Sequence, residues 1–430
     1  MVLSRLDLLH ALVVQHTFNI DAYQTNTVDK ATSDGHFYCD KAPGTVFLAL
    51  PSFYISTRIL SAMGIQIDSE KGWFWSERIT VLTSISALSA VGSVCLFLWL
   101  QGFVRSRCAL LCTFVASFGS VMFPYSTIMM SHGLVIGLFA IALLSLRLGW
   151  TLNEESQDEH GFAWRDFLGG LACGMAVACE YDAGLVACGI LIAVFAASRR
   201  RGCRSTVGAI PPLLLIPFYN WACVGNPLWL PYGHEEVFTE MHSGFYGIHA
   251  PNGYNVIHLT FSPERGLFFW TPFLLLAMPG YYFLLGRDRS MFFLCYLAPL
   301  GHVFVLSGYY TMEAGSTLGS RLLAPVVPLL ILPAGIAASK MPRVALLLAI
   351  LSMAGMGIST FVNLQMPSGE ANPLFNYYLP QLLAGNLDTA FGRAMGLHQP
   401  WGALPVLLLV LAGLTFVWKR VAQKPHSEMS

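Results

Sequence analysis

Repeated apolar runs of close to twenty residues constrain the fold of this chain more than any other feature of its sequence. A helix needs about 20 apolar residues to cross a hydrocarbon core about 30 Å thick. The pattern predicts an all-α fold, a polytopic transmembrane helical bundle of about eleven spans with outer-face loops and short amphipathic surface helices. We expect spans near residues 78–100, 108–123, 132–149, 167–179, 183–198, 205–223, 266–285, 290–306, 321–339, 342–363 and 402–418.

The connections between these runs alternate in chemistry. One set is short and basic, and the positive-inside rule places it in the cytoplasm. The other set is long, aromatic and acidic, so we expect it to face the periplasm or a lumen. The basic set carries Arg105, Arg107, Arg199, Arg200, Arg201, Arg204, Arg287, Arg289, Lys340, Arg343, Lys419, Arg420 and Lys424. The acidic set comprises residues 19–41, 124–131, 180–182, 225–265, 307–320 and 364–401.

This alternation is consistent only if the apolar segment from Thr45 to Met63 does not cross the membrane. We therefore expect one multi-pass transmembrane domain in a bacterial inner membrane or its equivalent, with the N-terminus outside and the C-terminus inside. Residues 1–430 form this domain. Residues 1–63 are expected to form an outer-face amphipathic helix, a polar loop and a re-entrant or juxtamembrane helix. Residues 64–430 are expected to form the helical bundle, with long outer loops at 224–265 and 364–401.

The stretch from Asn19 to Pro51 contrasts with the apolar sequence that follows it. Charged residues make up only 11% of the chain, yet Asp34, Asp40 and Lys41 stand close together here, before a Pro-Gly turn. A polar cluster joined directly to apolar sequence lies in water beside a membrane. We interpret it as the edge of an active site, and the alternative is an interfacial anchor in which Lys41 reaches lipid head groups.

Two arginines stand at outer ends of spans, against the positive-inside pattern. Arg265 lies in the run Ser262-Pro-Glu-Arg-Gly, and Arg321 ends the run Gly315-Ser-Thr-Leu-Gly-Ser-Arg. Because guanidinium binds phosphate in a bidentate manner, the two residues indicate a phosphate clamp. The alternative for each is an ion pair that holds a helix end.

Titratable residues also interrupt two apolar runs. Glu180 and Asp182 lie in a short break between half-length helices, where a charge at membrane depth costs about 3 kcal/mol unless it faces water or a partner. The break indicates a cavity, with a plain outer turn as the alternative. His132 opens a span, and an isolated histidine there is more often a capping or interfacial residue than a catalyst.

Composition argues against several other functions. The chain has 24 Lys and Arg and 24 Asp and Glu, so its net charge gives no reason to expect a nucleic-acid partner. Most of the ten cysteines lie inside apolar runs, and no Cys-x-x-Cys or Cys/His ligand spacing occurs. We therefore expect no metal site and no cofactor.

These residues resemble the C-type glycosyltransferase (GT-C) superfamily, which includes protein O-mannosyltransferases and the lipid A aminoarabinose transferase. The resemblance covers nearly the whole chain and implies an enzyme that moves a sugar from a polyprenyl-phosphate carrier to a lipid, glycan or protein acceptor on the outer face. In such enzymes the first outer loop supplies an acid, while lysine and arginine hold the lipid phosphate. The matching runs are Ser4-Arg-Leu-Asp-Leu8, Asp34 to Gly44, Ser262 to Gly266 and Asn372-Pro-Leu-Phe375.

The chain departs from the family pattern in three places. Relatives usually begin with a span that would end where this sequence starts. They also tend to carry an acidic pair before the residues that match Arg5, where this chain has Val2 and Leu3, so Asp7 would have to substitute as the base. Finally, His132 stands where relatives often have an aspartate.

The resemblance implies an inverting transfer in which a carboxylate removes a proton from the acceptor and cations neutralise the departing phosphate. The expected partners are the lipid-linked sugar donor, the acceptor and membrane lipids. One alternative is a transporter or flippase for a lipid-linked or anionic solute, although no internal repeat is visible. Another is a non-catalytic transferase-like subunit. The catalytic candidates are Asp7, Asp34 and Asp40, and the phosphate- or substrate-binding candidates are Arg5, Lys41, His132, Glu180, Arg265 and Arg321.

Overall fold

The structure is a computed structural model, and it describes residues 1–150, 159–311, 315, 317–367, 369–387, 389, 392–393 and 395–423. Side chains are described over the same ranges except at 159–162, 414, 417, 418 and 420–423. One of the predicted basic residues, Lys424, lies outside the described residues.

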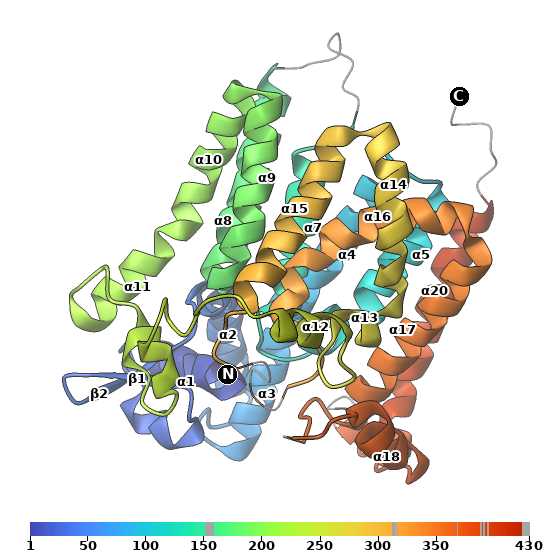
Figure 1. Cartoon of the computed structure of the whole chain (residues 1–430). Helices are drawn as coiled ribbons and strands as arrows, with labels where there is room; N and C mark the ends of the chain where they lie inside the picture. Colours follow the sequence, from blue (N-terminus) through green and yellow to red (C-terminus); the bar gives the residue numbers. More distant parts are fainter. Residues whose placement is uncertain are drawn as a thin grey trace.

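Helices form nearly all of the regular structure (Figure 1). The helices are α1 (Val2–His10), α2 (Gly44–Ala62), α3 (Glu70–Val81), α4 (Ala87–Leu100), α5 (Ser106–Phe118), α6 (Met122–Tyr125), α7 (His132–Ser145), α8 (Glu159–Cys179), α9 (Gly184–Ala197), α10 (Arg199–Leu213), α11 (Leu215–Val224), α12 (Gly253–Phe261), α13 (Leu267–Trp270), α14 (Ala277–Arg287), α15 (Arg289–Leu306), α16 (Val327–Lys340), α17 (Pro342–Val362), α18 (Leu379–Leu383) and α20 (Leu404–Gln423). Short 3-10 turns include η5 (Tyr181–Ala183), η6 (Pro231–His234) and η9 (Arg321–Val326). The strands are β1 (Lys30–Ser33) and β2 (His36–Cys39).

The helices have the length and composition expected of a membrane protein. Six continuous helical segments in the described part of the chain are long and apolar enough to cross a membrane, and four shorter apolar helices accompany them. Each of the predicted spans contains a helix. The prediction of an all-α polytopic membrane protein is confirmed.

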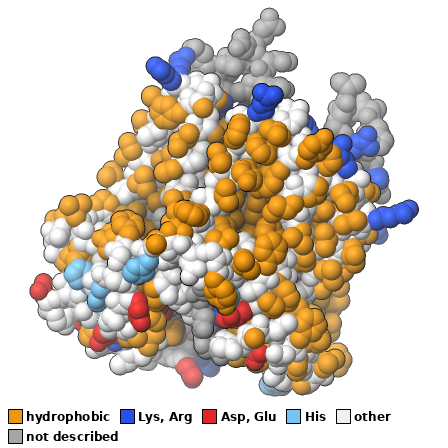
Figure 2. All heavy atoms as spheres, viewed as in Figure 1, with side chains coloured by type: hydrophobic (Ala, Val, Ile, Leu, Met, Phe, Trp, Pro, Cys, Tyr) orange, Lys and Arg blue, Asp and Glu red, His pale blue; other side chains and the backbone are white. Residues whose placement is uncertain are grey.

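Charge separates the two ends of the bundle (Figure 2). The turns between α9 and α10, α14 and α15, and α16 and α17 carry arginine and lysine, and we call this the basic end. The opposite end holds the N-terminus, the β1–β2 hairpin, α12 and α18 (Figure 1), together with the acidic side chains, and we call it the acidic end. The basic connections and the acidic connections predicted from the sequence therefore lie at opposite ends of the bundle.

The core of the bundle contains α16 and α7. The segment from Arg321 to Lys340 is almost entirely buried, as expected for a helix that is apolar on all sides. Beside it, α4 and α7 approach closely at Gly92 and Gly137, where a Cβ at Gly92 would lie 2.2 Å from the Cα of Gly137. Small residues allow this approach, which favours helix association in a membrane.

The polar stretch contains an element that the sequence analysis missed, a β-hairpin. Strands β1 and β2 pair antiparallel in the register Lys30 to Cys39. Asp34 and Gly35 form the turn, with φ angles of 50° and 83°. Asp-Gly is favoured in such turns because both central residues need positive φ, so the signal was present in the sequence.

The helices before and after this hairpin differ from the predicted amphipathic surface helix and re-entrant or juxtamembrane helix. The first helix, α1, is buried on all sides from Ser4 to His10, rather than presenting a polar face to water. The segment expected to be re-entrant or juxtamembrane is one continuous helix, α2, which does not fold back on itself.

Contacts at both ends place α2 at the acidic end of the bundle. Gly44 packs against the backbone of Ala178, at the end of α8. Farther along, the hydroxyls of Ser56 and Thr80 lie 3.5 Å apart, because α3 runs back alongside α2. Helix α2 is long enough to cross a membrane, and these contacts join its start to α8 and its second half to α3.

Candidate functional site

Helix α1 carries Arg5 into the centre of the acidic end. Its Nη2 donates to Glu180 Oε1 and to Ser131 Oγ, both at 3.1 Å. Ser131 also donates to Glu180, and His132 Nδ1 lies 3.8 Å from the same carboxylate oxygen. We call Arg5, Ser131, His132 and Glu180 the Glu180 cluster. All four residues are buried, so the predicted break at Glu180 is a polar centre inside the protein and not a plain turn.

The Glu180 cluster retains polar atoms without protein partners. Within the described part of the chain, Arg5 Nε and Nη1 and His132 Nε2 are buried and form no hydrogen bond. Asp182, in the adjacent turn η5, also has an unbonded oxygen there, although its other oxygen lies 3.8 Å from His302 Nε2. Buried polar groups normally have partners, so this centre is suited to a polar ligand or ordered water.

Arg265 and Arg321 both act on the buried Tyr125 hydroxyl. Arg265 Nη1 donates to the carbonyl of Thr317, and Tyr125 donates its hydroxyl to the carbonyl of Leu318. The charges of both arginines reach the Tyr125 hydroxyl. Arg321 also acts electrostatically on Glu180. Both predicted arginines are therefore buried at the acidic end. Arg321 is the one whose charge reaches Glu180.

Lys41 belongs to a second buried cluster. Its Nζ lies 3.0 Å from Asp29 Oδ1 and 3.8 Å from Glu235 Oε1, and it donates to Asp40. Ser4 of α1 donates to Asp40 over 3.2 Å. We call Asp29, Asp40, Lys41 and Glu235 the Lys41 cluster. Since Lys41 is buried and surrounded by carboxylates, the alternative of a lipid-head-group anchor is wrong in this structure.

The Lys41 cluster places one lysine among three carboxyl groups, and the amino group of Met1 also pairs with Asp29. Burial lowers the pKa of Lys41, but Asp40, Asp29 and Glu235 outweigh it and hold that pKa well above its usual value. Burial acts in the opposite direction on Asp29, yet Lys41 keeps the pKa of Asp29 well below its usual range. Burial and the neighbouring Asp40 raise the pKa of Glu235 to about 10. Glu235 is therefore neutral at pH 7, while Lys41 is charged and paired.

The two clusters both contact α1 and share aromatic neighbours. Ser4 and Arg5 are consecutive residues that contact different clusters. Tyr232 lies 6.0 Å from Lys41 Nζ, and the charge of Glu180 also reaches its hydroxyl. Tyr309 lies in the fields of both Lys41 and Arg321. The two clusters therefore form one extended polar centre.

The other two catalytic candidates, Asp34 and Asp7, form no hydrogen bond or ion pair with either cluster among the residues that the structure describes. Asp34 occupies the turn of the hairpin and is exposed, so the structure does not bring it to the buried clusters. Asp7 is buried on α1 and accepts a 3.0 Å hydrogen bond from Asn26. Burial raises the pKa of Asp7 to about 7, although the Asn26 hydrogen bond opposes the shift.

Several members of the centre were missed from the sequence. Asp29 and Glu235 were not singled out as partners of Lys41, and Ser131 and Tyr125 carried no recognisable motif. The proximity of Glu235 depends on the path of a long loop, which pairs with Ala31 through an isolated β-bridge. The sequence signal for Glu235 was its position among aromatic residues in an acidic outer loop.

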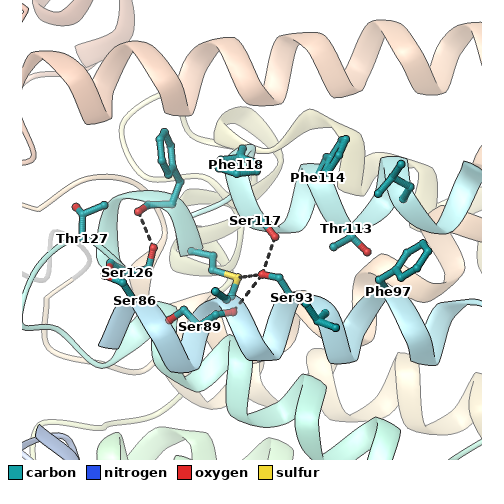
Figure 3. A pocket seen from close by; sticks show the side chains of 15 residues that line it. Ser86, Ser89, Ser93, Phe97, Thr113, Phe114, Ser117, Phe118, Ser126 and Thr127 are labelled. Carbon is teal, nitrogen blue, oxygen red and sulfur yellow. Dashed lines mark hydrogen bonds between the residues drawn. The ribbon is translucent and has the colours of Figure 1, made fainter. Parts of the chain in front are cut away.

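A separate groove of about 400 Å³ lies between α4 and α5 (Figure 3). Serines and phenylalanines line it, and Ser93 accepts a hydrogen bond from Ser117 in its floor. One end reaches Ser126, the neighbour of Tyr125. The groove is distinct from both charged clusters.

Comparisons with known proteins identify the fold. No protein-family model matches the chain, and no curated protein sequence is similar to it. Among solved structures, the chain is similar to ArnT from Cupriavidus metallidurans bound to undecaprenyl phosphate, with 13% identity and a TM-score of 0.53, over 97% of this chain and 69% of ArnT. The apo structure of ArnT from the same organism matches over 79% of this chain and 57% of that one, with 14% identity and a TM-score of 0.44.

The resemblance predicted from the sequence is therefore confirmed in the fold. The present chain has a fold similar to that of ArnT over 97% of its length. At this level of identity the comparison establishes architecture, and the roles of individual residues must come from the geometry described above.

Proposed function

We propose that this protein is a membrane glycosyltransferase that moves a sugar from a polyprenyl-phosphate carrier to an acceptor at the acidic end of the bundle. The observation that carries the proposal is the buried Glu180 cluster, in which Arg5 keeps two nitrogen donors without a partner among the described residues. A solved structure with a similar fold, that of ArnT, holds undecaprenyl phosphate, which supports the same class of carrier here.

The arginines have the chemistry that a phosphate leaving group requires. Departure of a polyprenyl phosphate places growing negative charge on its oxygens, and positioned cations stabilise that charge. Arg265 and Arg321 both act on Tyr125, so they can approach one anion. Arg5 would complete the set through its remaining donors. We assign the phosphate to these three arginines.

Lys41 takes a different role from the one expected from the sequence. It is already neutralised by Asp29 and Asp40, so a phosphate would have to displace a buried carboxylate to reach it. We propose that Lys41 organises the acceptor side of the centre, by holding Asp40 next to Ser4 of α1. Its movement toward the phosphate would require opening of the cluster.

We propose that a buried carboxylate acts as the base that removes a proton from the acceptor. Asp40 is the candidate from the first outer loop that lies in the polar centre, and Asp7 remains a proposal because its raised pKa suits proton transfer near pH 7. Glu180 is held by Arg5 and Ser131, which favours a role in orienting Arg5. Asp34 is exposed, and we give it no role in proton transfer.

Sugar transfer from synthetic polyprenyl-phosphate sugars in proteoliposomes tests the proposal. Arg321→Ala and Arg265→Ala should each lower kcat by about 10²–10³, and Asp40→Asn should lower it as strongly. Arg78→Ala is the matched control, because Arg78 lies at the same end but pairs with Glu77 at a partly exposed site. Full activity in all three site variants, with folding intact, would exclude the proposed roles.

A second function is favoured by one specific observation. Residues Val2 and Leu3 stand where an acidic pair is expected in GT-C enzymes, so the chain also fits a non-catalytic subunit that binds the lipid carrier. That reading predicts binding of undecaprenyl phosphate without transfer. Arg321→Ala would then weaken binding while no variant changed a transfer rate.

A further inference from the structure

Helix α12 has one apolar side that no described part of the protein covers. Tyr254, Ile257 and Phe261 are 73%, 62% and 54% exposed, and their spacing of three and four residues places them on one helix face. The opposite face is packed, because Leu259 and Thr260 are buried. A short helix with this division is typical of a segment that lies in the boundary of a lipid bilayer.

The position of α12 along the bundle is fixed by α15. The backbone N–H of Asn252 donates to Ser307 Oγ over 3.2 Å, and Asn255 Nδ2 donates to the carbonyl of Ser307 over 2.7 Å. Ser307 directly follows α15, which is long and apolar enough to cross the membrane. Helix α12 therefore lies at the level where a membrane-spanning helix ends (Figure 1).

The apolar side of α12 adjoins the lipid-facing surface of the bundle. On α15, Phe304 is 57% exposed one turn before Ser307, and Leu300 is exposed a further turn away. On the other side, the ring of Phe261 packs 5.1 Å from that of Phe268 in α13. An apolar surface that adjoins the exposed side of a spanning helix meets the hydrocarbon phase and not water.

We infer that α12 is a lipid-binding helix that inserts Tyr254, Ile257 and Phe261 into the leaflet at the acidic end. The partner is the bilayer itself, at its boundary between head groups and acyl chains. A tyrosine at the edge of the apolar side suits that boundary, where one end of the residue is apolar and the other is polar.

The same helix is joined to the proposed phosphate site. His258 Nε2 lies 3.1 Å from Glu264 Oε2, and Glu264 Oε1 lies 3.7 Å from Arg265 Nε. A helix held in the leaflet would thus fix the height of Arg265 relative to the membrane surface. This link rests on the proposed function, whereas lipid contact by α12 does not.

Lipid cross-linking of the full chain in nanodiscs of phosphatidylethanolamine and phosphatidylglycerol tests the inference. The photoreactive residue p-benzoylphenylalanine replaces Ile257 or Phe261, and mass spectrometry counts phospholipid adducts after illumination. Phe304 is the positive control on a spanning helix, and Glu240 is an exposed polar control in the same long loop. The readout needs no transfer activity, so it is independent of the proposed function.

Adduct yields at Ile257 and Phe261 should be within about twofold of the yield at Phe304 and well above that at Glu240. Yields at the Glu240 level would overturn the inference, since α12 would then face water. Cross-links from both positions to protein in place of lipid would also overturn it, because the surface would then bind a second protein chain. Comparable lipid adducts in a transfer-inactive Arg321→Ala background would support lipid binding by α12 irrespective of catalysis.

Discussion

Arg5 and Glu180 are 175 residues apart in the chain, yet Arg5 Nη2 lies 3.1 Å from Glu180 Oε1 in a buried ion pair. The pair joins the first helix of the chain to the turn between α8 and α9. It therefore fixes the position of α1, which in turn contacts both polar clusters.

Breaking this pair should destabilise the protein strongly. Arg5→Met leaves Glu180 buried without its cation, and removal of one partner of a buried ion pair costs about 3–5 kcal/mol. The double variant Arg5→Met with Glu180→Leu should recover part of the loss, because no isolated charge remains. Unfolding in a detergent of fixed concentration measures the difference.

Arg78→Met is the matched control for that experiment. Arg78 pairs with Glu77 at a partly exposed site, where such pairs contribute about 0–1 kcal/mol. If Arg5→Met cost no more than Arg78→Met, the pair would not position α1, and the proposed organisation of the centre would be incorrect.

The Lys41 cluster should respond very differently to two similar substitutions. Asp40→Asn removes a charge that Lys41 needs and should cost about 3–5 kcal/mol. Glu235→Gln replaces a carboxyl group that is neutral in the folded protein at pH 7, because its pKa is about 10, so it leaves no unpaired charge and should not destabilise the protein. Guanidinium titration of unfolding compares the two, and equal losses would contradict the charge assignment.

The spans were predictable because a long apolar helix can be recognised from its own residues alone. The segment from Arg321 to Lys340 is apolar on every side, and no knowledge of its neighbours is needed to identify it. The β1–β2 hairpin also had a local signal in Asp34-Gly35, which the concentration of charges obscured.

The polar centre was only partly predictable for the opposite reason. Arg265, Arg321 and Lys41 stood out because charges beside apolar runs are rare. Their partners did not, since Asp29 and Glu235 reach Lys41 only after the hairpin pairs with a distant loop. A sequence records the cost of a buried charge, but not which distant residue offsets it.

Helix packing next to the centre gives a prediction that does not depend on charge. A Cβ on Gly44 would lie 2.5 Å from the backbone carbon of Ala178, two residues before Glu180. Because backbone cannot move as freely as a side chain, Gly44→Ala should destabilise by about 1–3 kcal/mol. Thermal unfolding in nanodiscs measures this.

Gly355→Ala is the control for that packing effect, because no atom lies within 4 Å of its Cβ position in α17. Alanine favours a helix over glycine by about 1 kcal/mol, so this variant should be neutral or slightly stabilised. A similar loss in both variants would show that α17 and α2 are equally crowded, contrary to the structure.

Asp7 should make stability depend on pH in a defined direction. Burial raises its pKa to about 7 from the usual 3.8, so between these values the folded state binds more protons than the unfolded state. The stabilisation from the protonated Asp7 carboxyl is fully present below about pH 4 and is lost as the pH rises through about 7. Each unit of pKa shift changes the free energy of unfolding by at most about 1.4 kcal/mol. Asp7→Asn removes the titration.

The unfolding temperatures of wild type and Asp7→Asn should therefore diverge between about pH 5 and about pH 7, with the variant increasingly the more stable, and the difference should level off at higher pH. Gly355→Ala serves as the control, since it changes no titratable group and meets no neighbouring atom, so it should leave the wild-type pH dependence unchanged. A constant difference between wild type and Asp7→Asn would mean that the Asp7 carboxyl titrates at its ordinary value. It would then be ionised throughout the range, and its proposed role in proton transfer near neutral pH would lose its physical basis.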